Sequence, residues 1–100
     1  MTIIDDNTSI SRRSPVVAND LSENETVMLD IDRGMYFGVK DVGKAIWNEL
    51  AQQTTRDKIC RALMERYDVD DETCRREVGE FLAYLLEQEL IDVHSDDVPV

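Results

Sequence analysis

The side chains best suited to nucleophilic or metal chemistry are few and far apart in this sequence. His94 is the only histidine, and the two cysteines, Cys60 and Cys74, lie fourteen positions apart without a CxxC spacing. A Ser-His or Cys-His pair needs its histidine in a pocket backed by the core, and we expect His94 to lie in a frayed tail. These side chains also cannot supply the ligands of a zinc site. The sequence therefore predicts no catalytic residue and no metal site.

An acidic stretch that begins at Asp68 approaches the pattern of a calcium loop. Asp68, Asp70 and Glu72 alternate as the first ligands of such a loop do. The pattern then fails, because Thr73 stands where glycine is required and Gly79 where a bidentate glutamate is required. We interpret the stretch as the acidic start of a helix. The sequence also contains no GxGxxG motif and no P-loop, so we expect no cofactor and favour a binding module over an enzyme.

The length and charge of the chain limit the kind of protein it can be. At 100 residues it has the size of one small domain. Its net charge of −11 at pH 7 would be repelled by nucleic acid phosphates, which disfavours nonspecific DNA or RNA binding. The first residues show no basic and apolar targeting signal, and no apolar run approaches the length of a membrane span. We therefore expect a cytoplasmic protein with reduced thiols and no membrane contact.

Short β-prone segments in the first half of the chain predict an antiparallel sheet. Residues 15–18 are expected to form an edge strand, because they open with proline. Residues 26–31 alternate in character, and residues 35–39 continue the sheet after the turn Asp32-Arg33-Gly34. The alternation places Val27, Leu29 and Ile31 on one face and Thr26, Met28 and Asp30 on the other.

The second half of the chain has the apolar period of helices. One stripe runs through residues 42–50, a second through residues 59–67 and a third through residues 78–90. Trp47 is expected in the core, as large aromatic side chains usually are. The expected N-caps are Asp41, Thr54 in a capping box with Asp57, and the acidic stretch 68–71.

These elements predict one α+β domain, with a three-stranded antiparallel sheet followed by three helices. We expect residues 1–14 to be a flexible N-terminal segment without strand or helix periodicity. The folded domain is expected to span residues 15–91, followed by an acidic tail at residues 92–100.

The last predicted strand is expected to be an exposed edge of the sheet. Natural proteins blunt such an edge with Lys, Pro or a bulge, whereas Met35, Tyr36, Phe37, Gly38 and Val39 carry no charge. Unpaired N–H and C=O groups on an open edge template another strand. Gly38 would allow close approach of a second backbone, and a simple bend before the helix explains it equally well. We interpret this strand as an edge kept open for use.

The third helix is expected to form the opposite wall of a shallow apolar groove. Gly79 in its interior costs about 1 kcal/mol relative to Ala and lies one turn from Arg75 and Leu82. Tight packing of Gly79 against another part of the chain is an equally good explanation. Tyr36 and Phe37 point to opposite faces of their strand, and the sequence leaves open which of them is core. By helical spacing, we assign to the wall Arg75, Val78, Gly79, Leu82 and Leu86.

Several short motifs also follow one another in a recognisable order along the chain. They are the hairpin Leu29-Asp30-Ile31-Asp32-Arg33-Gly34-Met35-Tyr36-Phe37-Gly38-Val39, then Val42-Gly43 and Ile46-Trp47, then Tyr67-Asp68-Val69 and Phe81-Leu82. Together, over about residues 10–93, they resemble the PqqD-like family. Members of this family are winged-helix-like domains known as recognition elements for ribosomally made, modified peptides (RiPPs), and they bind the leader region of the precursor peptide.

The resemblance implies a winged-helix-turn-helix-like fold and a specific mode of binding. The leader would add as an antiparallel strand beside Met35–Val39, with its apolar side chains against the third helix. Main-chain bonds would set the register, pockets would set specificity, and the acidic field would favour leaders with Lys or Arg around an apolar anchor. The implied partners are the precursor leader, a separate leader peptidase and a cyclase. A homodimer that pairs its own open edges is a third possibility that could coexist with leader binding, so we expect a monomer or weak homodimer.

Within the family, the resemblance is closer to the standalone proteins of lasso-peptide clusters than to the quinone-pathway member. That member usually carries Tyr-Pro-Glu-Gly near the junction of sheet and helix, where this chain has Phe37-Gly38-Val39-Lys40-Asp41. Relatives also commonly place glycine at the end of the third helix, where this chain has Glu89. A chaperone of quinone cofactor biosynthesis therefore remains an alternative, ranked lower.

A winged-helix DNA-binding regulator is a second alternative, because strands with three helices could serve one. A recognition helix should bring Arg and Lys to the groove. From Asp68 to Asp97 the chain has eleven acidic residues and only two basic ones, Arg75 and Arg76. The charge therefore favours the peptide-binding hypothesis.

Overall fold

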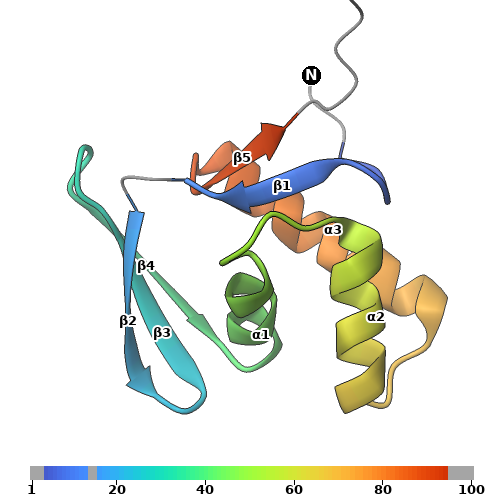
Figure 1. Cartoon of the computed structure of the whole chain (residues 1–100). Coiled ribbons are helices and arrows are strands. Elements are labelled where there is room, and N and C mark those ends of the chain that lie inside the picture. The colour runs from blue at the N-terminus through green and yellow to red at the C-terminus, as the bar shows by residue number, and fades with distance from the viewer. Residues whose placement is uncertain (1–3, 14–15, 95–100) are drawn as a thin grey trace, which may run out of the picture.

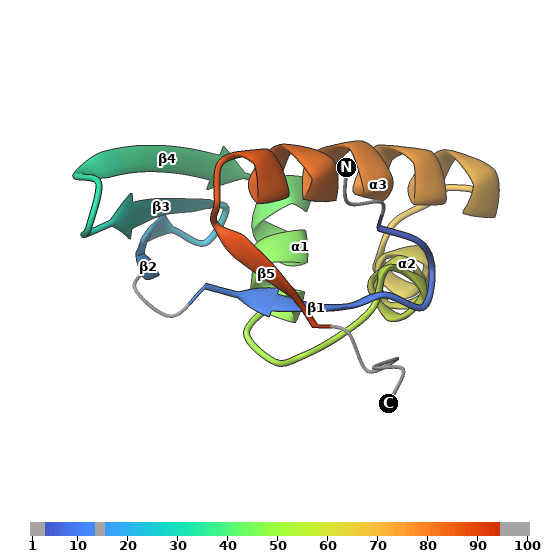
Figure 2. The same ribbon diagram turned by 90° about the horizontal axis from the view of Figure 1, so that it is seen from above.

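The computed structural model describes residues 4–13 and 16–94 and forms two small sheets around three helices (Figure 1). The three-stranded sheet stands on one side of α1, and α2 lies on the other side. Helix α3 runs along both α1 and α2, from near β4 to the far end of the domain, and a two-stranded ladder crosses above the helices (Figures 1 and 2). The elements in chain order are β1 (Ser9–Arg12), β2 (Val16–Ser22), β3 (Glu25–Asp30), β4 (Met35–Lys40), α1 (Val42–Glu49), α2 (Arg56–Arg66), α3 (Asp71–Glu87) and β5 (Ile91–His94).

The predicted sheet and its order are confirmed. The strands lie in the order β2-β3-β4, all antiparallel, and three helices follow them. Gly34 closes the β3–β4 turn at a φ of 65°, a left-handed conformation that glycine adopts without a steric penalty. The α+β fold class predicted from the sequence is therefore correct.

The face of β3 that packs on the core is its more polar face. Thr26, Met28 and Asp30 are buried, whereas Ile31 beyond the strand is 59% exposed. The polar groups are paired: the Thr26 hydroxyl donates to the Asp20 carboxylate at 2.7 Å, and Asp30 accepts from Arg33 at 2.6 Å. Local hydrogen bonds thus allow a Thr and an Asp to occupy inward positions.

The expectation of unstructured ends is wrong for two short segments. Residues 9–12, inside the predicted flexible segment 1–14, form β1, and residues 92–94 of the predicted tail belong to β5, which pairs with it antiparallel. Ile10 is fully buried, and the ring Nε2 of His94 lies 2.6 Å from the Ser11 hydroxyl. A strand with one buried apolar residue has no periodicity to detect. Of the two predicted segments, residues 1–3, 14 and 95–100 lie outside the described residues.

Strand β1 is fastened to α1 through Trp47, which is buried as predicted at 1% exposure. The Arg12 guanidinium lies 4.6 Å from the centre of the Trp47 ring, a cation–π distance. Arg12 Nε and Nη2 also donate to the Trp47 carbonyl at 3.1 and 2.8 Å. One arginine thus joins the ladder to the helical core.

The helix starts differ in part from the predicted caps. Asp70 caps α3 as expected, accepting from the Thr73 N–H at 2.7 Å, but Thr55 rather than Thr54 caps α2. Thr54 instead pairs its backbone with Ile10. Asp41 precedes α1 without a side-chain capping bond, at φ 54° and ψ −122°. These are the angles of the first central residue of a type II′ turn, where glycine dominates.

Replacing Asp41 by glycine should stabilise the fold. Relief of the left-handed backbone strain, worth about 1–3 kcal/mol, outweighs the extra flexibility of the unfolded chain, so we expect the free energy of unfolding to rise by about 1 kcal/mol. Urea unfolding followed by circular dichroism measures it. The matched variant Asp41→Ala keeps a Cβ in the strained conformation and should show no gain. A loss of stability in Asp41→Gly would contradict the argument.

Candidate functional site

Strand β4 is a free edge of the three-stranded sheet, as the sequence predicted. It pairs with β3 on one side, and no other strand of the described chain pairs with its second side. The Asp41 N–H donates to the Asn24 carbonyl at 2.8 Å, which continues the register of the hairpin by one pair. Because inward and outward positions alternate in an antiparallel ladder, the residues that direct N–H and C=O groups away from the sheet are Tyr36, Gly38 and Lys40.

Gly38 lies at the centre of this free edge. It is exposed and sits inside the strand opposite Val27, so the alternative explanation of a bend is not what the structure shows. A Cβ added there would meet nothing within 4 Å. The backbone at Gly38 is therefore open to the approach of another strand.

The other edge of the sheet, β2, is less suited to pairing. Its ladder with β3 has a register shift between Asp20 and Ser22. Asp20 also lies there, 3.5 Å from the Lys44 amine. Bulges and charges are the usual means of blocking an edge. Of the two edges, β4 is the one that remains open.

The register also settles which aromatic residue of β4 faces the core. Phe37 lies opposite the buried Met28 and packs against the core, whereas Tyr36 lies opposite Leu29 and is 73% exposed. Phe37 and Val39 thus face the helices, and Tyr36 stands on the outer face of the sheet.

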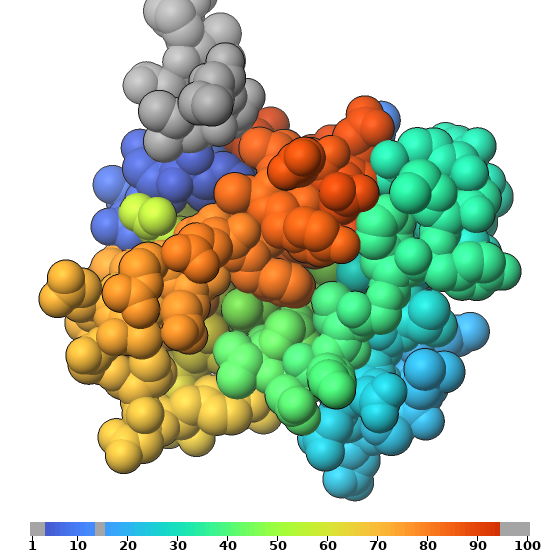
Figure 3. Space-filling model, turned by 180° about the vertical axis from the view of Figure 1, so that it is seen from behind, coloured from blue at the N-terminus to red at the C-terminus, as the bar shows by residue number. Residues whose placement is uncertain are grey.

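Helix α3 approaches β4 at Phe81. A Cβ on Gly43 would lie 3.5 Å from the Phe81 ring and 3.6 Å from the Val39 Cβ, so these three residues meet where β4 passes into α1. On the face seen in Figure 3, α3 (orange to red), α1 (green) and the end of β4 adjoin one another. A mostly apolar cavity of about 310 Å³ opens here, lined by Val42, Gly43, Ile46, Leu63, Tyr67, Val69, Cys74, Glu77, Val78 and Phe81.

The residues assigned to the helical wall from spacing fall into separate places. Val78 lines the cavity, Leu82 is fully buried in the core, and Leu86 packs against the core while half-buried. Arg75 and Gly79 lie on the opposite flank of α3, and a Cβ on Gly79 would meet the Arg56 guanidinium at 3.0 Å. Arg75 and Gly79 were assigned to the wrong flank because an apolar stripe identifies the buried side of a helix but not which of its two flanks borders a given strand.

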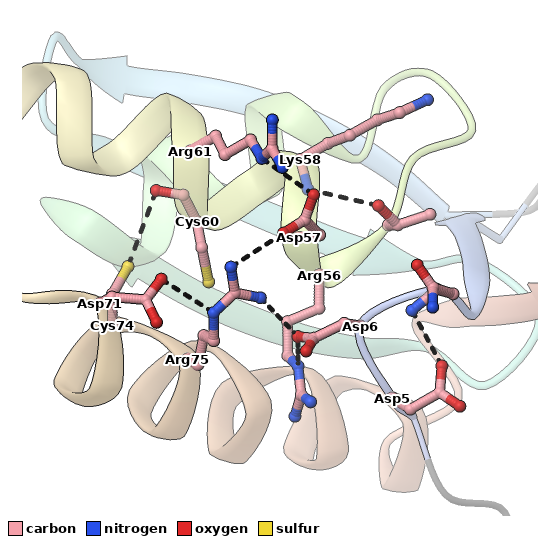
Figure 4. A network of polar contacts seen from close by, with 12 residues as sticks. Asp5, Asp6, Arg56, Asp57, Lys58, Cys60, Arg61, Asp71, Cys74 and Arg75 are labelled. Atoms are coloured by element: carbon pink, nitrogen blue, oxygen red, sulfur yellow. Dashed lines mark hydrogen bonds and ion pairs between the residues drawn. The ribbon is translucent and has the colours of Figure 1, made fainter.

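Arg75 instead belongs to an ion-pair network on that opposite flank (Figure 4). Its guanidinium donates to Asp6, Asp57 and Asp71 at 2.7, 2.8 and 2.9 Å, which raises its pKa. Hydrogen bonds from Arg56 and Arg75 lower the pKa of Asp6. This network fixes residue 6 against α2 and α3, and thus has a structural role.

The two cysteines are free and buried, as expected. Burial, together with a hydrogen bond to Cys74, raises the pKa of Cys60 to about 12, so its thiol stays protonated at neutral pH.

Within residues 4–13 and 16–94 there is no cluster of His, Cys, Asp or Glu that could hold a metal ion. None of the helices in this part of the chain is long and apolar enough to cross a membrane.

The sequence analysis did not assign Phe81 and Tyr84 of α3 to the site, although Phe81 is where α3 approaches β4. Phe81 stacks on Tyr84 with ring centres 6.5 Å apart, and Tyr84 is 46% exposed. Two aromatic side chains three positions apart on the exposed flank of a helix were the available signal. Arg33 joins the β3–β4 turn to the end of α3, where it donates to the Gln88 carbonyl.

Comparisons with solved structures agree with this geometry. A structure described as TbiB1 in complex with the TbiA(β) leader peptide is 31% identical, with a TM-score of 0.78, over 86% of this chain and 99% of that one. A lasso peptide synthetase B1 complexed with its leader peptide is 18% identical, with a TM-score of 0.73, over 83% and 96% of the two chains, and supports the fold alone. A search of curated proteins found no match.

The family model of coenzyme PQQ synthesis protein D (PqqD) matches residues 25–91, from the first residue of β3 to the first residue of β5. This range contains the open edge β4, the whole of α3 and every residue that lines the cavity between the helices. The resemblance seen in the order of the sequence motifs is thereby confirmed, and the chain belongs to the PqqD family.

Proposed function

We propose that this protein is a RiPP recognition element, which binds the leader region of a ribosomally made precursor peptide by adding it as a strand to β4. The observation that carries the proposal is the open edge, with outward main-chain groups at Tyr36, Gly38 and Lys40 beside the aromatic flank of α3. Strand addition uses main-chain bonds for affinity and side-chain pockets for specificity. The likeness to TbiB1, solved in complex with the TbiA(β) leader peptide, supports leader binding here.

The inner and outer faces of the sheet at β4 would contact different side chains of the leader. A strand beside β4 would place alternate side chains toward Phe37, Val39 and Phe81 on the inner face and beside Tyr36 on the outer face. The mostly apolar cavity of about 310 Å³ between the helices, next to the point where β4 passes into α1, would accept apolar side chains of the leader. We retain Met35–Val39 and Val78 as the proposed contact residues and add Phe81 and Tyr84. We leave out Leu82, which is fully buried, and Arg75, Gly79 and Leu86, which share the opposite flank of α3 by helical spacing.

The protein so described carries no reaction of its own. We propose that it acts in the cytoplasm, as a monomer or weak homodimer, and hands the bound precursor to a separate leader peptidase and a cyclase. Lasso-peptide precursors are the proposed substrate class, which the resemblance of the sequence motifs to the standalone proteins of lasso-peptide clusters supports. The net charge of −11 favours leaders with Lys or Arg near the apolar anchor.

The direct test is a titration of fluorescein-labelled leader peptide into the purified full chain, followed by anisotropy. The peptides are the leader half of any short precursor encoded nearby and the TbiA(β) leader. We expect saturable, submicromolar binding of the first, weakened when its aromatic or proline residues are changed to Ala. Absence of binding by both peptides, with a duplex DNA control also negative, would overturn the proposal.

The free edge makes a sharper prediction at Gly38. Gly38→Pro removes an outward N–H and places a ring in the path of the incoming strand, while the ladder to β3 uses its neighbours. We expect at least about a tenfold loss of leader affinity, from one main-chain bond near 1 kcal/mol and the added crowding. The control Gly38→Ala keeps the N–H, its Cβ meets nothing within 4 Å, and affinity should stay within about twofold. Equal affinity in a folded Gly38→Pro protein would disprove strand addition at β4.

The two flanks of α3 give a second pair of variants. Phe81→Ala removes the ring that meets Val39 and Gly43 and should weaken leader binding about tenfold. Gly79→Ala lies on the other flank, where only the end of the Arg56 side chain must move, and should leave affinity unchanged while gaining about 1 kcal/mol of helix stability. Calorimetric binding and urea unfolding measure both quantities. The reverse pattern of affinities would restore the wall first assigned from spacing.

A further inference from the structure

The β3–β4 turn is tied to the C-terminal end of α3 by one side chain, Arg33. Its Nε donates to the Asp30 carboxylate at 2.6 Å, and its Nη2 donates to the carbonyl of Gln88. Its Nη1 lies 3.4 Å from the carboxylate of Glu89. We call these contacts of Arg33 with Asp30, Gln88 and Glu89 the turn clasp. They join two segments 55 positions apart in the chain.

The turn side of the clasp is rigid. Asp30 is 3% exposed, and its carboxylate also accepts the Arg33 backbone N–H at 3.3 Å. The Asp30 carbonyl accepts from the Gly34 N–H at 2.8 Å, which closes the turn. Hydrogen bonds from Arg33 hold the pKa of Asp30 below its usual value, so the carboxylate stays ionised near neutral pH.

On the helix side of the turn clasp, Arg33 supplies a positive charge that the last turn of α3 lacks. The last turn of α3, all of it described, has no basic side chain, although a cation there is favoured by the helix dipole. Arg33 brings that cation from the sheet and satisfies the carbonyl of the C-cap residue Gln88. Glu89 follows at φ 59° in a Schellman turn, in which Leu90 N–H bonds to the Leu85 carbonyl and Glu89 N–H to the Leu86 carbonyl.

Glu89 occupies a position that suits glycine better, and its carboxylate faces two arginines. It lies 3.5 Å from Arg13 as well as 3.4 Å from Arg33. A left-handed backbone conformation is strained for any residue other than glycine. The ion pair between Glu89 and Arg33 offsets part of this backbone strain and helps to hold Arg33 in place. A hollow of about 220 Å³ surrounds this group, lined by Arg13, Asp30, Asp32, Arg33 and Glu89.

The turn clasp lies at one end of β4. At the other end, a Cβ on Gly43 would touch both the Val39 Cβ and the Phe81 ring, so Gly43 packs between β4 and α3. The edge strand is therefore held to α3 at both ends, and the outward groups between these two points stay at a fixed distance from the helix. Resting on the proposed function, we propose that Arg33 is a positioning residue that pre-organises β4 against α3 for leader binding. Without Arg33, the free energy needed to order β4 would lower the affinity for the leader.

The first test needs no ligand. Hydrogen exchange of the inward β4 amides should be faster in Arg33→Ala than in the wild type, about tenfold at Met35 and Phe37 and little changed at Val39, which the Phe81 contact still holds. Arg13→Ala is the matched control, because it removes a contact to the same Glu89 and leaves the turn untouched. Unchanged exchange at Met35 and Phe37 would overturn the proposal. If Arg33→Ala fails to fold, Arg33→Gln, which keeps a donor near Asp30, replaces it.

The second test measures affinity with the labelled TbiA(β) leader and with the leader of any short precursor encoded nearby. Arg33→Ala should bind at least about fivefold more weakly, and Arg13→Ala within about twofold of the wild type. Thr55→Ala, which loses the N-cap of α2 and lowers the stability of the fold, should bind like the wild type, so lost stability alone does not explain the effect. Equal affinity for Arg33→Ala would overturn the positioning role. Failure of the wild type to bind any leader, with exchange at Phe37 still faster in Arg33→Ala, would count against the proposed function alone.

Discussion

Burial of one stripe of α3 is the constraint on which the rest of the structure depends. Cys74, Val78, Leu82 and Leu85 are all nearly or fully inaccessible, and the other elements are arranged to cover them. In a chain of 100 residues, a core of this size must be shared by every layer. Because the buried stripe uses only one side of α3, its two flanks are free for different tasks. One carries the ion pairs of Arg75, and the other borders the open strand.

The fold could be predicted from the sequence wherever a pattern extended over a whole element. The three helices and the β3–β4 hairpin have such patterns, and they were found. Strands β1 and β5 were not, because each is short and is stabilised by partners at the far end of the chain, as Ile10 and His94 show. The polar inner face of β3 was equally hidden, since the bonds that make Asp30 acceptable inside come from a turn residue.

The site could be predicted in part for a related reason. The open edge follows from a local property, the absence of charge from Met35 to Val39, and the structure has it where expected. The wall of α3 depends on which flank faces β4, and this is set by long-range packing at Gly43 and Phe81. The link from Arg33 to Gln88 spans most of the domain, and no sequence pattern indicates it. The properties of a single strand could be predicted from the sequence, whereas the packing of one element against another could not.

The β1–β5 ladder gives the domain a convenient shape for combination with other proteins. Ser9 and His94 face each other across the ladder, so the first and last described strands begin and end side by side (Figure 1). A domain whose two ends are adjacent can be inserted into a surface loop of another protein without forcing the loop apart. The edge β4 belongs to the separate three-stranded sheet and would remain accessible in such an arrangement. The same architecture can thus serve as a free-standing protein or as a module within a larger chain.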